Sequence, residues 1–232
     1  MPASITGTGT ATQADGAATG TITLTIPGAA TDGDLLVLWV AARGLSTAGA
    51  TTISTPSGWT KLGTTQVYSI TSTGRLGSAL FWRRHSSGSP TVTVTYGAAY
   101  VNVGEAVGVG VTVISGAPGS PWTGTVAEGI TATDATAPDP SPTQRAMILA
   151  HYAKAGTIAI SPDHGFTAAY GNSVSPSGAG LAFGAHYLTA DPGTYTMPTT
   201  RHVRSSVAVI DRPAGGIYFG LPVGGGGIVA AA

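Results

Sequence analysis

The sequence predicts an all-β protein, an antiparallel, jelly-roll-like β-sandwich built from an internally duplicated set of strands, with extended arms at both ends. Three observations lead to this prediction. Short runs with period-two alternation recur along the chain and are bounded by Gly, Pro, Asp and Ser. No segment of about 12 or more residues sustains the i, i+3, i+4 apolar stripe of a helix. The same order of runs then appears a second time.

The first two expected strands differ in pattern. In the run TITLTIP, Ile22, Leu24 and Ile26 share one face while threonines occupy the other, as a half-buried strand requires. Residues 35–40, LLVLWV, are apolar without interruption, which favours a strand buried on both faces. This run is too short, and too closely flanked by turn residues, to favour a helix.

The remaining strands of the first half follow a loop rich in threonine, serine and glycine. They are expected in PSGWTKLGTTQVYS, GSALFWRRH, the strictly alternating PTVTVTY and VGVGVTVIS. The second half repeats this series, and paired landmarks lie at similar separations: 107 residues from Trp59 to Phe166 and 96 from Val111 to Val207. We interpret the repetition as an internal duplication of a unit of roughly 100 residues, with loops of varying length.

The domain organisation follows from these runs. We assign residues 1–19 to an N-terminal arm, 20–212 to the β-sandwich with pseudo-repeats 20–115 and 129–212, and 213–232 to an apolar, Gly-rich C-terminal tail. Ten to twelve strands, roughly, suit two packed antiparallel sheets. The halves form either one continuous sandwich, which we favour, or two stacked ones.

The composition excludes several classes of partner. Charged residues make up 9% of the chain, against roughly 25% in typical soluble domains. Ten basic residues balance ten acidic ones, so no electrostatic footprint is expected for nucleic acid or an anionic membrane. Cysteine is absent, and neither a secretory signal nor a membrane-spanning run is visible. A near-zero net charge suits a protein packed against neighbouring copies, and we expect a homo-oligomer.

No motif for catalysis, a metal or a cofactor is found. The five histidines are scattered without ligand spacing, and we expect His151 and His186 to be hydrogen-bonded structural residues. GxSxG and the phosphate-binding P-loop pattern are absent. Most carboxylates stand in turn-like settings, where they cap main-chain groups, although a pair meeting through space stays open. We therefore predict a protein that is not an enzyme, with no metal and no cofactor.

Sugar binding is the more serious alternative, because sandwich folds often present aromatic rings as stacking platforms. Trp39 and Trp82 fall in expected strands and are assigned to the core. Trp59 has an aromatic counterpart in the second half, which favours packing. Trp122, in the loop between the repeats, is the candidate stacking residue together with Tyr100, although a role in plugging that loop is an equal interpretation.

The C-terminal segment GGIYFGLPVGGGGIVAAA carries no charge and would be an aggregation hazard if left in water. Two interpretations are open for it and for the N-terminal arm. Each lies along its own sandwich as an extra edge strand, or inserts into a neighbouring subunit. On the second interpretation, the candidate docking residues are the large apolar side chains of the tail: Ile217, Tyr218, Phe219, Leu221, Val223, Ile228 and Val229.

Several segments carry a family resemblance. These are GDLLVLWVAARG, the Pro-Ser-Gly-Trp turn at residues 56–59, the hairpin GSALFWRRHSSGSPTVTVTY and the closing VTVISGAPGSPW. Over residues 20–212 the chain resembles β-sandwich proteins encoded in phage and prophage structural gene clusters. The resemblance implies a virion component, either a capsid decoration or minor capsid protein or a tail-associated domain, with no catalytic residues to carry over.

The expected function is that of a bacteriophage structural or accessory protein. Its partners would be the major capsid protein or other virion subunits on the particle exterior, and it would be located in the virion after assembly in the host cytoplasm. The alternative is a tail-associated receptor- or carbohydrate-binding module that contacts a host-surface glycan.

Overall fold

The computed structural model describes residues 2–14, 20–44, 52–70, 74–88, 90–97, 106–175 and 180–211. In these residues the chain forms thirteen β-strands in three antiparallel sheets and no helix. None of the described segments is therefore a helix that could cross a membrane. The all-β antiparallel sandwich predicted from the sequence is confirmed, although the described strands form three sheets rather than two.

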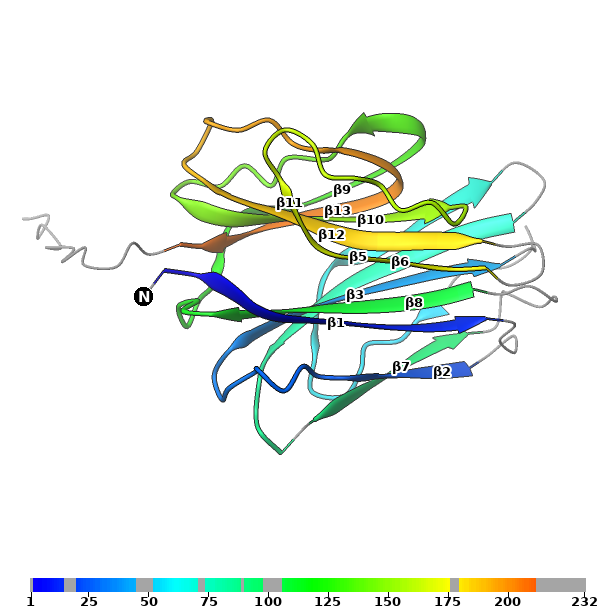
Figure 1. Ribbon diagram of the computed structural model, residues 1–232, viewed down its shortest axis with the longest axis horizontal. Coiled ribbons are helices and arrows are strands. Elements are labelled where there is room, and N and C mark those ends of the chain that lie inside the picture. Colours follow the sequence, from blue (N-terminus) through cyan, green and yellow to red (C-terminus); the bar gives the residue numbers. More distant parts are fainter. Residues whose placement is uncertain are drawn as a thin grey trace, which may run out of the picture.

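The first sheet lies in the middle of the molecule (Figure 1). Its five strands are, in spatial order, β1 (Ser4–Ala14), β8 (Ala106–Ser115), β3 (Leu35–Gly44), β6 (Gly74–Arg84) and β5 (Thr60–Ile70). β3 is the central strand and pairs with β8 on one side and β6 on the other. The continuous apolar run expected to be buried on both faces forms this strand, and residues 35–40 are all fully buried.

The second sheet is formed by the second half of the chain. Its order is β11 (Thr167–Val174), β12 (Leu181–Ala190), β10 (Ala146–Ala155), β13 (Thr199–Ile210) and β9 (Trp122–Thr136). The strand order matches that of the first sheet: β10, β12, β11 and β13 take the places of β3, β6, β5 and β8, and β9 takes that of β1. Each five-stranded sheet therefore follows the same plan, as the repeated order of runs in the sequence predicts.

The third sheet is small and belongs to the first half alone. It consists of β2 (Gly20–Thr25), β7 (Thr91–Gly97) and the two-residue β4 (Thr52–Ile53), in the order β2-β7-β4. Its alternating residues behave as predicted, because Ile22 and Leu24 are buried while the threonines between them are exposed. Figure 1 shows the three sheets as stacked layers, with this sheet packed on the face of the first sheet that points away from the second.

Two continuous apolar clusters hold the layers together. Between the first and second sheets, Trp39 stacks on His151 with ring centroids 5.5 Å apart, and its indole Nε1 donates to the Tyr152 carbonyl at 3.1 Å. Trp39 pairs with Leu80 and Gly110 in its own sheet, while His151 pairs with Ala185 and Ser205 in the other. The two rings thus hold equivalent positions in the two sheets and meet in the shared core.

The glycines of β8 permit the close approach of the second sheet. A Cβ atom on Gly110 would lie 2.2 Å from the Tyr170 ring, and one on Gly108 would lie 2.2 Å from the Phe183 ring. Both glycines lie on the strand face turned toward the second sheet, between buried valines that point the other way. The alternation VGVGV therefore places valines in one core and leaves room for aromatic rings in the other.

The N-terminal segment is part of this body. Residues 4–14, within the segment assigned to an N-terminal arm, form β1 at the edge of the first sheet and pair with β8. Of the two interpretations of this arm, the extra edge strand is therefore observed. The Ala3 main-chain N–H donates to the Asp211 carboxylate at 2.8 Å, and Arg145 donates to the same carboxylate at 2.9 Å. This contact fixes both ends of the described chain at the same end of the molecule (Figure 1).

Candidate functional site

The candidate residues from the sequence fall in different places. The seven apolar residues of the C-terminal tail and Tyr100 lie outside the described residues. Trp122 lies at the start of β9, is partly buried, and packs edge-on against Trp82 with ring centroids 5.6 Å apart. Its ring is thus engaged with the core between the first and second sheets rather than presented to solvent as a flat platform.

Most of the carboxylates serve the main chain. Six of them accept a hydrogen bond from a backbone N–H at 2.5–2.9 Å: Asp32, Asp34, Glu128, Asp139, Asp163 and Asp211. Those of Asp34 and Asp139 are the local caps that turn-like settings predict, and the other four join distant segments. Among the described residues no group of three or more His, Cys, Asp and Glu side chains is placed to hold a metal ion. These carboxylates act in turns and in contacts between strands.

The buried histidines are part of the core. His186 lies within 3.1 Å of the Ile160 carbonyl, in agreement with the expected hydrogen-bonded structural role. For His151 neither ring nitrogen makes a hydrogen bond of ordinary geometry in the part of the chain described, although the Ser205 main chain lies close enough to interact with the ring. Its ring stacks on Trp39 instead. Burial lowers the pKa of His151 from its ordinary value of 6.5 to about 3, and the neighbouring main chain of Ser205 offsets this only in part.

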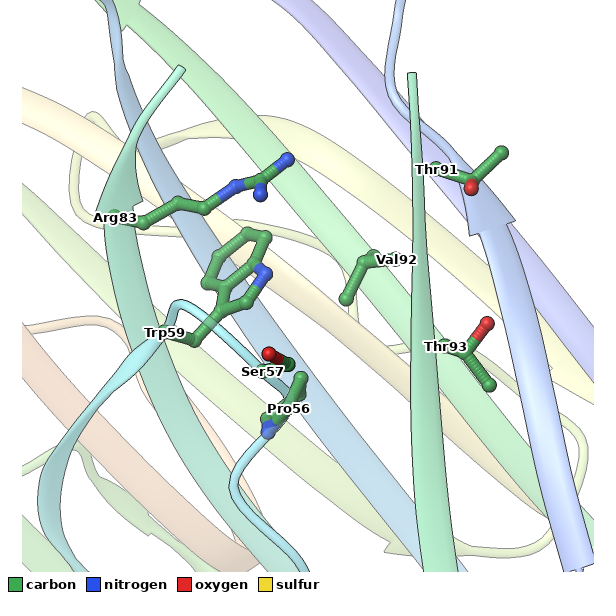
Figure 2. Close-up of a pocket in the computed structure, with 7 residues that line it drawn as sticks. All are labelled: Pro56, Ser57, Trp59, Arg83, Thr91, Val92 and Thr93. Carbon is green, nitrogen blue, oxygen red and sulfur yellow. The ribbon is translucent and has the colours of Figure 1, made fainter. Parts of the chain in front are cut away.

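A surface cavity lies beside the small sheet. It has a volume of about 330 Å³ and is lined by Pro56, Ser57, Trp59, Arg83, Thr91, Val92 and Thr93. This volume lies at the lower end of the range typical of ligand sites. Figure 2 shows Arg83 and Trp59 on one side, β7 on the other, and the turn at residues 56–57 at one end. The cavity is therefore bounded by β6, β7 and the turn before β5.

The turn beneath the cavity follows from its sequence. The Trp59 N–H donates to the Pro56 carbonyl at 3.1 Å, and Gly58 takes a φ of +76°, a left-handed conformation that favours glycine. The turn directs Trp59 inward, so that its ring joins the core between the first sheet and the small sheet and is 6% exposed. The packing role expected for Trp59 is confirmed.

Arg83 gives the cavity its charge. Its guanidinium carbon lies 4.9 Å from the centre of the Trp59 ring, so that the cation covers the indole. Partial burial lowers the pKa of Arg83 from its ordinary value of 12.5, but a guanidinium stays protonated at neutral pH. The cavity thus combines a planar cation, the Ser57 hydroxyl and the backbone of β7. This chemistry suits carboxylates and main-chain amides.

Sequence reasoning did not find this cavity. Arg83 stands in an apolar-to-basic run that predicts only a strand, and nothing local indicates that β4 would be two residues long. The available signal was a comparison of the two repeats. Trp59 and Phe166 correspond, but the second half has no arginine at the place equivalent to Arg83, so this cation distinguishes the first half.

Comparisons with known proteins identify no relative. No family model matches the sequence, no curated protein matches it, and no solved structure matches the fold.

Proposed function

We propose that this protein is a structural or accessory component of a bacteriophage particle, without a catalytic role, that docks onto other virion subunits as a capsid decoration or minor capsid protein. Its β-sheet body would act as a rigid unit on the particle exterior, in several copies, and its C-terminal tail would attach it. Contact with the major capsid protein through this tail is the central element of the proposal.

The observation that supports the proposal is a contrast along the chain between the well-anchored residue Asp211 and the uncharged, apolar sequence of the tail that follows it. Asp211 is 6% exposed and is held by Ala3 and Arg145, so the chain is firmly anchored immediately before the tail. Residues 213–232 then combine seven large apolar side chains with no charged residue. A segment of this composition is stabilised by burial against apolar surface.

The magnitude of this effect is large enough for docking. Full burial of a large apolar side chain is worth about 1.5–3 kcal/mol. Seven such residues together would supply on the order of 10–20 kcal/mol before the costs of association and of ordering the chain are subtracted. Micromolar or tighter attachment requires about 8 kcal/mol net.

The test compares the full chain with a chain that ends at residue 212, each expressed in a host that produces the particles. We expect the shortened protein to fold but to be missing from purified particles, as measured by quantitative mass spectrometry and imaging. Replacement of Ile158, an apolar residue with 75% exposure, by serine is the matched control and should leave occupancy unchanged. Equal occupancy of the shortened and full chains would overturn the proposal.

A further inference from the structure

The cavity beside Arg83 occupies the place where a third strand of the small sheet would continue. β4 pairs with β7 only through Thr52–Ile53, opposite residues 96–97. One further bond follows, from the Ser54 N–H to the Thr95 carbonyl at 2.9 Å. The chain then turns at Pro56 and enters the core at Trp59. Residues 91–93 of β7 thus have no strand opposite them on this side in the described structure.

The direction of the main-chain groups of β7 follows from two hydrogen bonds. On one side, the Ile26 N–H donates to the Pro90 carbonyl at 2.8 Å, so residues 92, 94 and 96 direct their N–H and C=O groups toward β2, as Pro90 directs its C=O. On the other side, the bond to Thr95 shows that the main-chain groups of residues 91, 93 and 95 point to the side of β7 on which β4 lies. Both observations assign the main-chain groups of Thr91 and Thr93 to the cavity.

A side-chain contact supports this assignment. In an antiparallel ladder the pairs without main-chain hydrogen bonds lie closer together, so their side chains meet. Thr23 and Thr93 are opposite each other, and their hydroxyl oxygens lie 2.9 Å apart. Thr93 is therefore in a pair without main-chain bonds to β2, and its N–H and C=O point away from β2.

The remaining walls of the cavity complement an extended peptide. Val92 and Trp59 are 4% and 6% exposed and provide an apolar floor, while Arg83 borders the side opposite β7 (Figure 2). A strand added beside β7 would bring alternate side chains over this floor and would place one of them near the guanidinium. A carboxylate there would be held by a charge-assisted pair with Arg83.

We propose that this cavity binds a short extended peptide segment of a partner protein, which adds to the edge of β7 at Thr91 and Thr93 and places an acidic side chain against Arg83. The peptide backbone supplies the hydrogen bonds, and Arg83 and the apolar floor select the side chains. The residues that line this cavity are not part of the tail sequence, so the proposal can be tested independently of the proposed attachment to a particle.

The experiment uses the full chain labelled with ¹⁵N and a blocked hexapeptide of alternating valine and threonine with one central aspartate. Titration followed by amide spectra is expected to shift the Thr91 and Thr93 resonances together. The same peptide with asparagine in place of aspartate should bind about tenfold more weakly, the loss expected for one charge-assisted contact. A version methylated on alternate backbone nitrogens should not bind.

Three variants of the protein separate the possible outcomes. Arg83→Gln should weaken binding of the acidic peptide about tenfold and leave binding of the asparagine peptide unchanged. Thr93→Pro removes an N–H that faces the cavity and should weaken both peptides. Arg201→Gln removes a cation that pairs with Asp134 on the second half of the chain, and is the matched control without effect. Folding of each variant is checked by its amide spectrum.

Other results would overturn the proposal. Sodium acetate or free aspartate that shifts the same resonances at the same concentration as the peptide would make this a small-anion site. A neutral oligosaccharide that shifts them more strongly would make it a sugar site. No shift with either peptide at millimolar concentration, or equal binding by wild type and Thr93→Pro, would show that no strand is added to β7.

Discussion

The two halves of the chain share one strand plan but differ in what covers the outer face of each sheet. In both halves a turn that contains a positive-φ glycine places a buried aromatic ring on the face of the sheet that points away from the shared core. The ring is Trp59 in the first half and Phe166 in the second. The neighbouring strands differ: Arg83, opposite Leu36, corresponds to Leu188, opposite Ile148. The same framework thus carries a cation on one side of the molecule and an apolar side chain on the other.

The outer layers differ more than the sheets. The first half has separate ladders, β1 with β8 and β2 with β7. The second half has a single long ladder of β9 with β13, interrupted by register shifts, and no separate small sheet among its described residues. Its outer face is closed by irregular segments, where the Tyr195 hydroxyl donates to Asp139 at 2.5 Å and Met197 is buried. Burial and the Asp139 carboxylate raise the pKa of Tyr195.

The difference teaches that the shared core constrains the inner faces and leaves the outer faces free to vary. Trp39 and His151 must pack against each other, and Gly110 must admit Tyr170, so changes on one sheet require changes on the other. The outer layers have no such mutual requirement. In the first half a cavity lies beside an open strand edge, whereas in the second half residues of irregular segments, Tyr195 and Met197 among them, pack on the outer face.

The largest expected effect is on the contact between the halves. Trp39→Ala should lower the free energy of unfolding by about 3–5 kcal/mol, because it removes a fully buried ring and leaves His151 without its stacking partner. Urea denaturation measures the loss. Ile158→Ala, at a site with 75% exposure, should change the same quantity by less than about 0.5 kcal/mol. A small loss for Trp39→Ala would mean that the two sheets do not share a core.

The second prediction concerns the pH dependence of stability, which arises because His151 can bind a proton and its partner Trp39 cannot. His151 has a pKa of about 3 when folded and 6.5 when unfolded. The unfolded chain therefore binds an additional proton between these values, and stability is full above pH 6.5 and decreases as pH falls toward 3. This group alone should cost about 1.4 kcal/mol per pH unit within that window.

The measurement compares wild type with His151→Phe, which keeps an aromatic ring against Trp39. Between pH 6.5 and 4.5 the variant should lose about 2–3 kcal/mol less stability than wild type, because it has no proton to bind at this position. His186 and His202 are retained in both proteins, and burial lowers their pKa values too, so their own titrations contribute to both curves. Parallel curves would mean that His151 is not buried in its neutral form.

The strands around this contact show how much of the fold the sequence predicts. The uninterrupted run at residues 35–40 predicted a strand with two buried faces, and alternation at Ile22 and Leu24 predicted a strand with one. The third layer was not predicted, because alternation gives the orientation of a face and not what covers it. The contact between Trp39 and His151 could not be predicted for the same reason, since it depends on how two sheets from different halves of the chain pack together.

The candidate site shows the same limit. Trp59 was correctly assigned to packing, because its counterpart Phe166 marks a shared structural position. The cavity arises from where β4 stops and from the side chain of Arg83 on another strand, and both depend on contacts between distant segments. The role of Trp122 as a stacking platform assumed that its ring is exposed. Its contact with Trp82 depends on how β9 lies against β6, which a local sequence pattern does not give.

The third prediction tests the direction of the main-chain groups of β7. Val92→Pro should lower the free energy of unfolding by about 2–3 kcal/mol, because it removes an N–H that bonds to β2 and leaves a carbonyl there unpaired. Thr93→Pro should cost less than about 1 kcal/mol, because its N–H faces the cavity. Amide exchange provides a second measurement: the Thr93 amide should exchange much faster than that of Val92. Equal protection of the two amides would contradict the assignment.

The smallest expected effect on stability comes from replacing Arg83 of the first half by leucine, the residue found at the equivalent position of the second half. Arg83→Leu places at this position the residue that Leu188 supplies in the other sheet, where it packs beside Phe166 without a cation. Leucine keeps an apolar contact with Trp59, so stability should change by less than about 1 kcal/mol. Peptide binding should fall about tenfold, as for Arg83→Gln. If Arg83→Leu instead destabilised the fold by several kcal/mol, Arg83 would be a structural cation over Trp59, and the difference between the outer layers would be one of packing rather than of binding.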